Sequence, residues 1–361
     1  MPQSLFRHGA FAVATADLTV RCLAAAAGAT SVQVRTQGGE VYTPLHPELF
    51  DKRGPRADWF DEQFVAAIEE GEAALRRLVV KEHPDAETYS FPFLHPKFAT
   101  LLLEEAQNYN ASGLPNRKPN GMNNYGILWN YIGMDSMFQA IQKQYIAPVA
   151  RMLFPHLGGA SLDHQHSYLV QYSPDMDPHG LDIHHDSCDI TFNAALDEPG
   201  TYEGCGLTFC GLYSTKEYRK YTFTYRHMLG RAILYDGRMR HGAEAIMAGT
   251  RTNLVMWSYS SAYRSTQTYQ WNNEGRHNSV GGADPRCVSY HHDNDYCQYK
   301  LPGYHRRCTK NGRNSFGPAW RAALKDSSYW EVGAVLDASA APVSSSRAKR
   351  KSRGRSRNAE L

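Results

Sequence analysis

The sequence predicts an α+β protein in which helices precede a core of antiparallel strands, arranged as a sandwich or a jelly roll. Two observations support this class. Before residue 160 the apolar residues recur at helical spacing, whereas after Ser161 short runs of β-branched and aromatic residues have a period of two. Short strands of this kind, separated by turn residues, are typical of antiparallel folds and argue against a parallel α/β sheet.

Three helices are expected in the first half of the chain. Apolar residues at helical spacing predict one amphipathic helix from Asp61 to Val80. A second helix is expected from about Pro96 to Tyr109, with proline at its start, and a third from Asp135 to about Phe154. Asn, Gly and Pro crowd the segment from Asn110 to Asn124, which predicts a loop.

Six half-buried strands are expected after residue 161. In the second of them, alternation places the apolar side chains on one face and Asp189, Thr191 and Asn193 on the other. The predicted strands are Ser167 to Tyr172, Asp189 to Leu196, Gly206 to Leu212, Tyr221 to Arg226, Arg231 to Asp236 and Arg251 to Tyr259.

The charge of the chain is concentrated at its C-terminal end. The last 18 residues hold seven basic residues and one acidic residue, and their low complexity predicts disorder. The rest of the chain carries slightly more acidic than basic residues, so its charge does not indicate a nucleic-acid partner, although contact through the tail stays open. We expect an N-terminal helical extension (1–88), a helical support region (89–160), a strand domain (161–263), a C-terminal extension (264–337) and a disordered basic tail (338–361).

The seven cysteines are an odd number at irregular spacing, and we expect most of them to be reduced thiols. No apolar run reaches the roughly 18 residues that a membrane span requires, so no span is expected. A cytoplasmic or nuclear location is favoured, although the arginine-containing first 35 residues keep organelle targeting open. A structural zinc site is the less favoured interpretation of one C-terminal group, which lacks a close Cys pair: Cys287, His291, Cys297, His305 and Cys308.

The motif Leu181-Asp-Ile-His-His-Asp186 carries a predicted metal site. On a strand His184 and Asp186 project to the same face, while His185 points away. His241, expected at the end of the strand Arg231 to Asp236, stands 57 residues after His184 and can supply a third ligand. Two imidazoles and one carboxylate leave open positions that suit iron(II). A second His-His-Asp sequence, at 291–293, has no strand pattern around it and no distal histidine followed by an arginine.

Four further residues are expected to form a pocket for an anionic co-substrate. Arg251 lies ten residues after His241, and its guanidinium can bind a distal carboxylate through two charge-assisted hydrogen bonds. Trp257 faces the same side of its strand by even spacing and can form an apolar wall. Tyr172 can add a hydrogen bond to that carboxylate, and Asn193 faces the same interior as Thr191.

These residues resemble two families of known function. The segments Tyr168-Leu-Val-Gln-Tyr172, His184-His-Asp186 and Thr191-Phe-Asn193 look like the oxygenase domain of procollagen lysyl hydroxylases, which is similar to that of prolyl 4-hydroxylases. The segments Lys118 to Gly126 and His241-Gly-Ala243, with Met152-Leu-Phe-Pro155, resemble the 2-oxoglutarate and iron-dependent oxygenase domain-containing protein 2 family.

The resemblance covers roughly Tyr89 to Tyr259 and departs from the pattern at two positions. Lys118 stands where an arginine is expected, and Cys205 stands where lysyl hydroxylases carry glycine. Neither position belongs to the predicted metal ligands.

The resemblance implies a double-stranded β-helix core with flanking helices. It also implies an Fe(II)-dependent dioxygenase in which O2 and 2-oxoglutarate are consumed, ascorbate keeps the iron reduced, and a C–H bond is hydroxylated while 2-oxoglutarate becomes succinate. A peptidyl lysine or proline of a protein or peptide substrate is the expected target. Two alternatives stay open: a non-catalytic metal-binding jelly roll, and an oxidative demethylase of nucleic acids.

Overall fold

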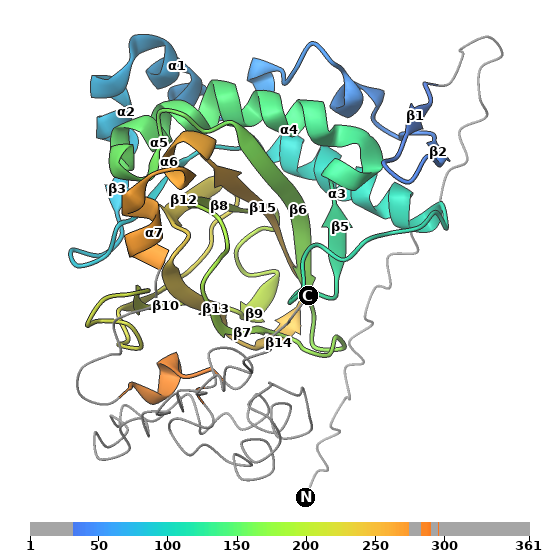
Figure 1. The fold of residues 1–361 in the computed structure, drawn as a ribbon. Coiled ribbons are helices and arrows are strands. Elements are labelled where there is room, and N and C mark those ends of the chain that lie inside the picture. The colour runs from blue at the N-terminus through green and yellow to red at the C-terminus, as the bar shows by residue number, and fades with distance from the viewer. Residues whose placement is uncertain (1–31, 274–282, 290–294, 296–361) are drawn as a thin grey trace, which may run out of the picture. The chain divides into compact units, whose positions relative to one another are not determined.

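Two antiparallel sheets form the centre of the protein in the computed structural model, which describes residues 32–273, 283–289 and 295 (Figure 1). The larger sheet has seven strands in the order β3-β4-β12-β8-β15-β6-β5. Its strands are β3 (Val80–Lys81), β4 (Thr88–Pro92), β12 (Arg231–Asp236), β8 (Ile190–Ala195), β15 (Arg251–Tyr259), β6 (His164–Tyr172) and β5 (Gly126–Leu128).

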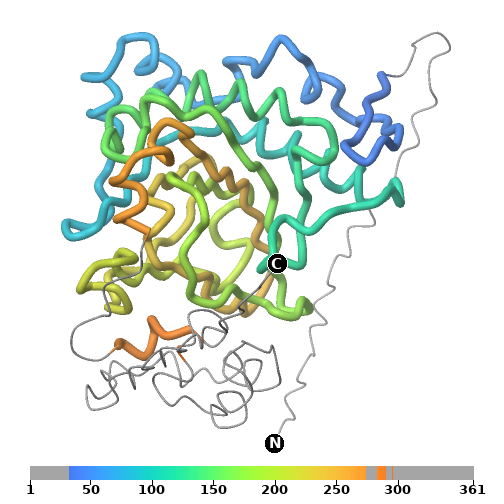
Figure 2. The backbone as a smooth tube through the Cα atoms, viewed as in Figure 1, coloured from blue at the N-terminus to red at the C-terminus, as the bar shows by residue number. Residues whose placement is uncertain are grey.

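The second sheet has four strands in the order β11-β10-β13-β7. These strands are β11 (Phe223–Tyr225), β10 (Leu207–Leu212), β13 (Met239–Ala243) and β7 (Leu181–His184). Two short two-stranded sheets pair β14 (Ile246–Gly249) with β9 (Tyr202–Gly204), and β1 (Val34–Arg35) with β2 (Val41–Tyr42). Figure 2 shows the effect of this order: β15, late in the chain, lies between the earlier strands β6 and β8.

The predicted strands from 231 to 236 and from 251 to 259 are confirmed at both ends. The interpretation that His241 ends the first of them is wrong. A turn at Gly237 and Arg238 separates β12 from β13, and His241 lies in the middle of β13, in the other sheet. The sequence Met-Arg-His-Gly-Ala lacks the alternation that marks a strand, so the pattern could not reveal β13.

The expected single helix from Asp61 to Val80 is in fact two helices. The Asp61 side chain caps the first by accepting a hydrogen bond from Phe64 N, and Gly71, with φ of 101°, separates the two. The helix from Pro96 is confirmed, and the third expected helix contains a π-helical turn. The helices are α1 (Glu62–Glu70), α2 (Glu72–Leu78), α3 (Pro96–Ala111), α4 (Asp135–Ile141), α5 (Ala147–Leu153), α6 (Ser261–Arg264) and α7 (Gln267–Asn273), with π segments at Asn130–Met134 and Gln142–Ile146 and short 3₁₀ segments at Pro47–Phe50, Ala57–Trp59, Pro155–Leu157 and Pro285–Cys287.

The main hydrophobic core lies between the helices and one face of the seven-stranded sheet. Strand β8 shows why: Ile190, Phe192 and Ala194 join this core, whereas Asn193 lines a pocket on the other face. All six residues of β8 are buried, so the expected half-buried strand is covered on both sides. The core has members from the segments 33–88, 89–160 and 161–263, which lie in one compact unit beginning at Gln33.

The structure tests the expectations about the cysteines and about a membrane span. Cys210 and Cys287 form a disulfide, which corrects the expectation of reduced thiols at these two positions, whereas Cys188 and Cys205 are free and buried. Among the described residues, no helix is long and apolar enough to cross a membrane.

Candidate active site

The structure brings His184, Asp186 and His241 together between the two sheets. Strands β7 and β13 pair so that His184 lies directly opposite His241. Asp186 lies two residues beyond the end of β7, where its backbone N–H donates to Gly237 O at 2.8 Å. Its carboxylate oxygens lie 3.5 Å from Nε2 of His184 and 3.6 Å from Nε2 of His241. Within the described part of the chain, this buried trio is the group whose geometry suits a metal ion.

Backbone contacts fix both imidazoles in the form that a metal requires. Nδ1 of His184 donates to Asp182 O at 2.7 Å, and Nδ1 of His241 donates to Met239 O at 2.8 Å. The Nε2 lone pairs are therefore directed toward Asp186. Burial lowers the pKa of His241 to about 4, which keeps the ring neutral near pH 7.

The carboxylate of Asp186 is held in its ionised form. Burial alone would raise its pKa, but the two imidazoles and a hydrogen bond from Thr191 Oγ1, at 2.6 Å, lower it. Two imidazoles and one carboxylate with their donor atoms facing one point fit iron(II), because they leave half of an octahedral shell for other ligands. His185 points elsewhere, with its ring stacked on Tyr213 at 4.5 Å between centroids.

Arg251 is buried in the same pocket, where it contacts backbone and amide oxygens. Its side chain is 1% exposed, its Nε donates to Asn253 Oδ1 at 2.8 Å, and its Nη1 donates to Cys205 O. Among the described residues, no Asp or Glu lies within ion-pair distance of it. The other buried arginines differ, since Arg240 pairs with Asp295 at 2.5 Å. A buried, unpaired guanidinium is costly, so this end of the pocket is built for an anion.

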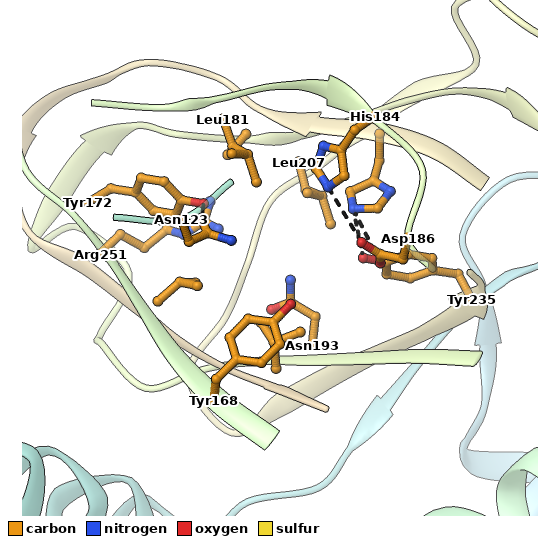
Figure 3. Close-up of a pocket in the computed structure, with 14 residues that line it drawn as sticks. Asn123, Tyr168, Tyr172, Leu181, His184, Asp186, Asn193, Leu207, Tyr235 and Arg251 are labelled. Carbon is orange, nitrogen blue, oxygen red and sulfur yellow. Dashed lines mark hydrogen bonds and ion pairs between the residues drawn. The ribbon is translucent and has the colours of Figure 1, made fainter. Parts of the chain in front are cut away.

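The metal-ligand trio and Arg251 lie at opposite ends of one pocket (Figure 3). The pocket encloses about 380 Å³ of space free of atoms, including space open to solvent. Tyr172 and Arg251 lie at one end, while Asp186 and Tyr235 lie at the other. Its walls come from both sheets and from one loop: Asn123, Tyr168, Val170, Tyr172, Leu181, His184, Asp186, Asn193, Leu207, Tyr235, His241, Ala243, Arg251 and Val255.

Tyr172, Asn193 and Arg251 all line the pocket. Trp257 does not line it: Val255, two residues earlier on β15, forms that part of the wall. The Trp257 ring packs outside against Tyr168, 5.4 Å between centroids. Even spacing gave the correct face of the strand but not the depth of the pocket.

Sequence reasoning missed Asn123, Tyr168 and Tyr235. Tyr235 lies in a predicted strand, and its hydroxyl is 3.3 Å from Nε2 of His241. Alternation along that strand could have placed it, since it shares a face with Ile233. Asn123 lies in a loop, where no periodicity exists to assign a direction.

The competing histidine groups have separate outcomes. The histidine-containing segment from Asp163 to His166 lies mostly in β6, and Nε2 of His166 is 2.8 Å from Pro119 O. The second His-His-Asp sequence at 291–293 lies outside the described residues. So does most of the possible zinc group, from which Cys287 is removed because it is disulfide-bonded.

A two-sheet antiparallel core that holds two histidines, an aspartate and a buried arginine in one pocket is characteristic of mononuclear iron oxygenases that use a 2-oxo acid. The OGFOD2-like domain model matches residues 39–159 of this chain. The chain is 34% identical over 242 residues to the 2-oxoglutarate and iron-dependent oxygenase domain-containing protein ICU11 of Arabidopsis thaliana, covering 64% of this chain and 57% of that protein.

It is also 31% identical over 246 residues to the 2-oxoglutarate and iron-dependent oxygenase domain-containing protein 2 of Xenopus tropicalis, covering 66% of this chain and 68% of that protein. The chain thus belongs to the 2-oxoglutarate and iron-dependent oxygenase domain-containing protein 2 family. It spans 57 to 65% of the length of the first three curated relatives. The family domain begins at residue 39, so the resemblance extends further toward the N-terminus than Tyr89, where the sequence motifs begin.

A weaker similarity is to the human multifunctional procollagen lysine hydroxylase and glycosyltransferase LH3. The identity is 28% over 229 residues, covering 60% of this chain and 28% of that protein. The resemblance of the sequence motifs to lysyl hydroxylases is therefore also found over a longer alignment.

Proposed function

We propose that this protein is an Fe(II)- and 2-oxoglutarate-dependent dioxygenase. The observation that carries the proposal is the pairing, in one pocket, of three converging metal-ligand side chains with a buried arginine that has no carboxylate partner in the described part of the chain. His184, Asp186 and His241 would hold the iron. Bound iron(II) would supply the activation of O2, and ascorbate would keep the metal reduced.

The arrangement of the strands supports the same class. Ten strands run from β6 to β15, and β9 and β14 form a separate small sheet. The other eight, numbered in chain order from β6, follow the order first, eighth, third, sixth in the larger sheet and second, seventh, fourth, fifth in the smaller one. That order is the one expected of a double-stranded β-helix, or jelly roll, and His184 and His241 lie on its neighbouring strands β7 and β13.

The roles of the pocket residues follow from their positions. Arg251 would bind the distal carboxylate of 2-oxoglutarate through charge-assisted hydrogen bonds and so orient its oxo-acid end toward the metal. Asn193 accepts a hydrogen bond from Asn253 at 2.6 Å, and Asn253 accepts one from Arg251, so this chain of contacts holds the guanidinium in place. Val170, Leu207 and Val255 would exclude water from the carbon chain of the co-substrate.

The prime substrate is proposed to be a peptidyl lysine or proline. Support for a peptidyl lysine comes from the relative named as a procollagen lysine hydroxylase. Reaction with such a residue would add one oxygen atom to the side chain while 2-oxoglutarate becomes succinate and carbon dioxide.

The cytoplasmic or nuclear location stays a prediction. The disulfide between Cys210 and Cys287 argues against this location, because disulfides are rare in the cytoplasm and nucleus.

The proposed activity is tested by incubating the purified protein with Fe²⁺, ascorbate, O2 and 2-oxoglutarate and measuring succinate. We expect slow formation of succinate without a prime substrate, and faster formation with lysine- or proline-containing peptides that gain one oxygen atom by mass spectrometry. His241→Ala serves as the metal-site control. A non-catalytic metal-binding protein would instead give no succinate above the metal-free sample with any peptide, and that outcome would exclude the proposed function.

A further inference from the structure

The loop between α3 and β5 is held in place by its asparagines. Asn120 Oδ1 accepts hydrogen bonds from the backbone N–H groups of Met122 and Asn123, each at 2.9 Å. Asn116 Nδ2 donates to Gly126 O at 3.0 Å, and His166 contacts Pro119 O. Side chains that bond to nearby backbone fix a turn without regular secondary structure. The loop therefore presents a defined face to the pocket.

Asn123 is the residue of this loop that reaches the pocket. Its side chain is buried and lines the cavity together with Tyr172 and Arg251. Figure 3 shows Asn123 beside Tyr172 and Arg251, at the end of the pocket away from Asp186. The guanidinium carbon of Arg251 lies 5.4 Å from the centre of the Tyr172 ring.

The hydrogen bonds of Asn123 determine which way its amide faces. Tyr172 donates its hydroxyl to Asn123 Oδ1 at 3.1 Å, and Asn123 Nδ2 donates to Asn120 Oδ1 at 3.1 Å. Asn120 Oδ1 also accepts from two backbone donors, so the Asn123 atom that faces it must be the nitrogen. The amide nitrogen has a second hydrogen, and no partner for it is found among the described residues.

The same contacts change the role of Tyr172. Burial raises the pKa of Tyr172, so its hydroxyl stays protonated and acts as a donor. Its hydroxyl donates to Asn123 and is not directed at the space beside Arg251. Asn123 thereby extends the polar end of the pocket: the tyrosine orients the amide, and the amide offers an N–H to the cavity.

We propose that Asn123 is a binding residue for the distal carboxylate of the dicarboxylate co-substrate, with Tyr172 as its positioning residue. This inference rests on the proposed function. Arg251 supplies the charge, and Asn123, from the loop between α3 and β5, supplies a further donor at the same end of the pocket, so a five-carbon 2-oxo dicarboxylate would be held at both ends. A 2-oxo monocarboxylate of the pyruvate type gains nothing from Asn123.

Calorimetric titration of the Mn²⁺-loaded, oxygen-free protein with 2-oxoglutarate and with pyruvate tests this inference. We expect Asn123→Ala to weaken 2-oxoglutarate binding about 10- to 30-fold, the loss of one hydrogen bond to a charged group. Asn123→Asp places a carboxylate there and weakens binding more than about 100-fold. The pyruvate affinity and the Mn²⁺ affinity should stay within twofold. Asn124→Ala, at the exposed neighbouring position, is the matched control and should bind 2-oxoglutarate as the unaltered protein does.

Circular dichroism and thermal unfolding establish that each variant is folded, and Tyr172→Phe provides a second, milder perturbation with an expected loss of about threefold. If folded Asn123→Ala and Asn123→Asp both bind 2-oxoglutarate within threefold of the unaltered protein, while Arg251→Met does not bind it, this inference fails and the proposed function stands. If the unaltered protein binds no 2-oxoglutarate, both fail.

Discussion

The variant Arg251→Met should lose most of its affinity for 2-oxoglutarate while its free energy of unfolding without ligand changes little. Methionine keeps an unbranched chain as far as the position of Nε and removes the charge. Loss of a buried and unpaired charge recovers several kcal/mol of desolvation cost. Against this, Cys205 O and Asn253 Oδ1 lose their donor, at about 1–3 kcal/mol each. Because the two effects oppose each other, we expect the free energy of unfolding without ligand to change by less than about 2 kcal/mol.

The stabilisation of the folded protein by bound 2-oxoglutarate should change much more. At a concentration 100 times its Kd, 2-oxoglutarate stabilises the unaltered protein by about 2.7 kcal/mol. Loss of the charge-assisted hydrogen bonds, worth roughly 3 kcal/mol, raises Kd more than 100-fold and leaves less than about 0.5 kcal/mol of stabilisation at that concentration.

Urea unfolding of the Mn²⁺-loaded protein, with and without 2-oxoglutarate, measures both quantities. Arg240→Met is the control, because Arg240 is paired with Asp295 and its loss leaves a buried carboxylate with fewer partners, at a cost of about 3 kcal/mol or more. The reasoning is refuted if Arg251→Met loses as much stability as Arg240→Met and still gains the full stabilisation from 2-oxoglutarate.

Four further predictions concern the surroundings of the site. Burial and the charge of Arg251 hold the pKa of His227 well below its usual value, so this ring does not take up a proton in the folded protein. The unfolded chain takes up that proton below about pH 6.5, so the free energy of unfolding falls by roughly 1.4 kcal/mol at pH 5.5. Urea titrations at pH 7.5 and 5.5 should show this loss in the unaltered protein but not in His227→Asn. Cys205 has φ of 55°, so Cys205→Gly should be about 1 kcal/mol more stable than Cys205→Ala, and the reverse order in thermal unfolding would contradict a left-handed backbone there. Cys287→Ala opens a disulfide that joins residues 77 apart and should lower the free energy of unfolding by about 2–4 kcal/mol, whereas an unchanged value under oxidising conditions would exclude the bond. In Gly242→Ala the new Cβ would lie 2.8 Å from Leu181 O, so β7, which carries His184, must shift. Titration with metal should show at least a tenfold loss of metal affinity, and an unchanged metal affinity would contradict this packing.

Much of the site could be predicted from the sequence because the types of a few residues and their spacing already limit which ligands they can bind. A His-x-Asp spacing, a distant histidine and a following arginine each limit the metal and the anion that a pocket can hold. These constraints act on side chains and survive errors in secondary structure. His241 was assigned to the wrong strand position, yet its role as a third ligand did not depend on that assignment.

Other parts of the pocket could not be predicted, for identifiable physical reasons. Trp257 and Val255 lie on the same face of β15, and only the packing of Trp257 against Tyr168 decides which of them lines the pocket. Asn123 is turned inward by hydrogen bonds within its own loop, and such contacts leave no periodic signal. The pairing of Cys210 with Cys287 depends on a contact across 77 residues that irregular cysteine spacing does not indicate.

The irregular pairing of β7 with β13 links the backbone to the metal site. His184 lies opposite His241, but Leu181 lies opposite Ala243, so three steps along β7 match two steps along β13. The extra residue lies at Asp182 or Ile183, and Asp182 O accepts the hydrogen bond that fixes the His184 ring. In a regular ladder Leu181, three residues before His184, would face away from the pocket, because side chains alternate along a strand. The bulge therefore lets Leu181 line the pocket opposite Ala243 while His184 stays opposite His241, so the wall beside the metal ligands depends on the backbone register of β7 and β13.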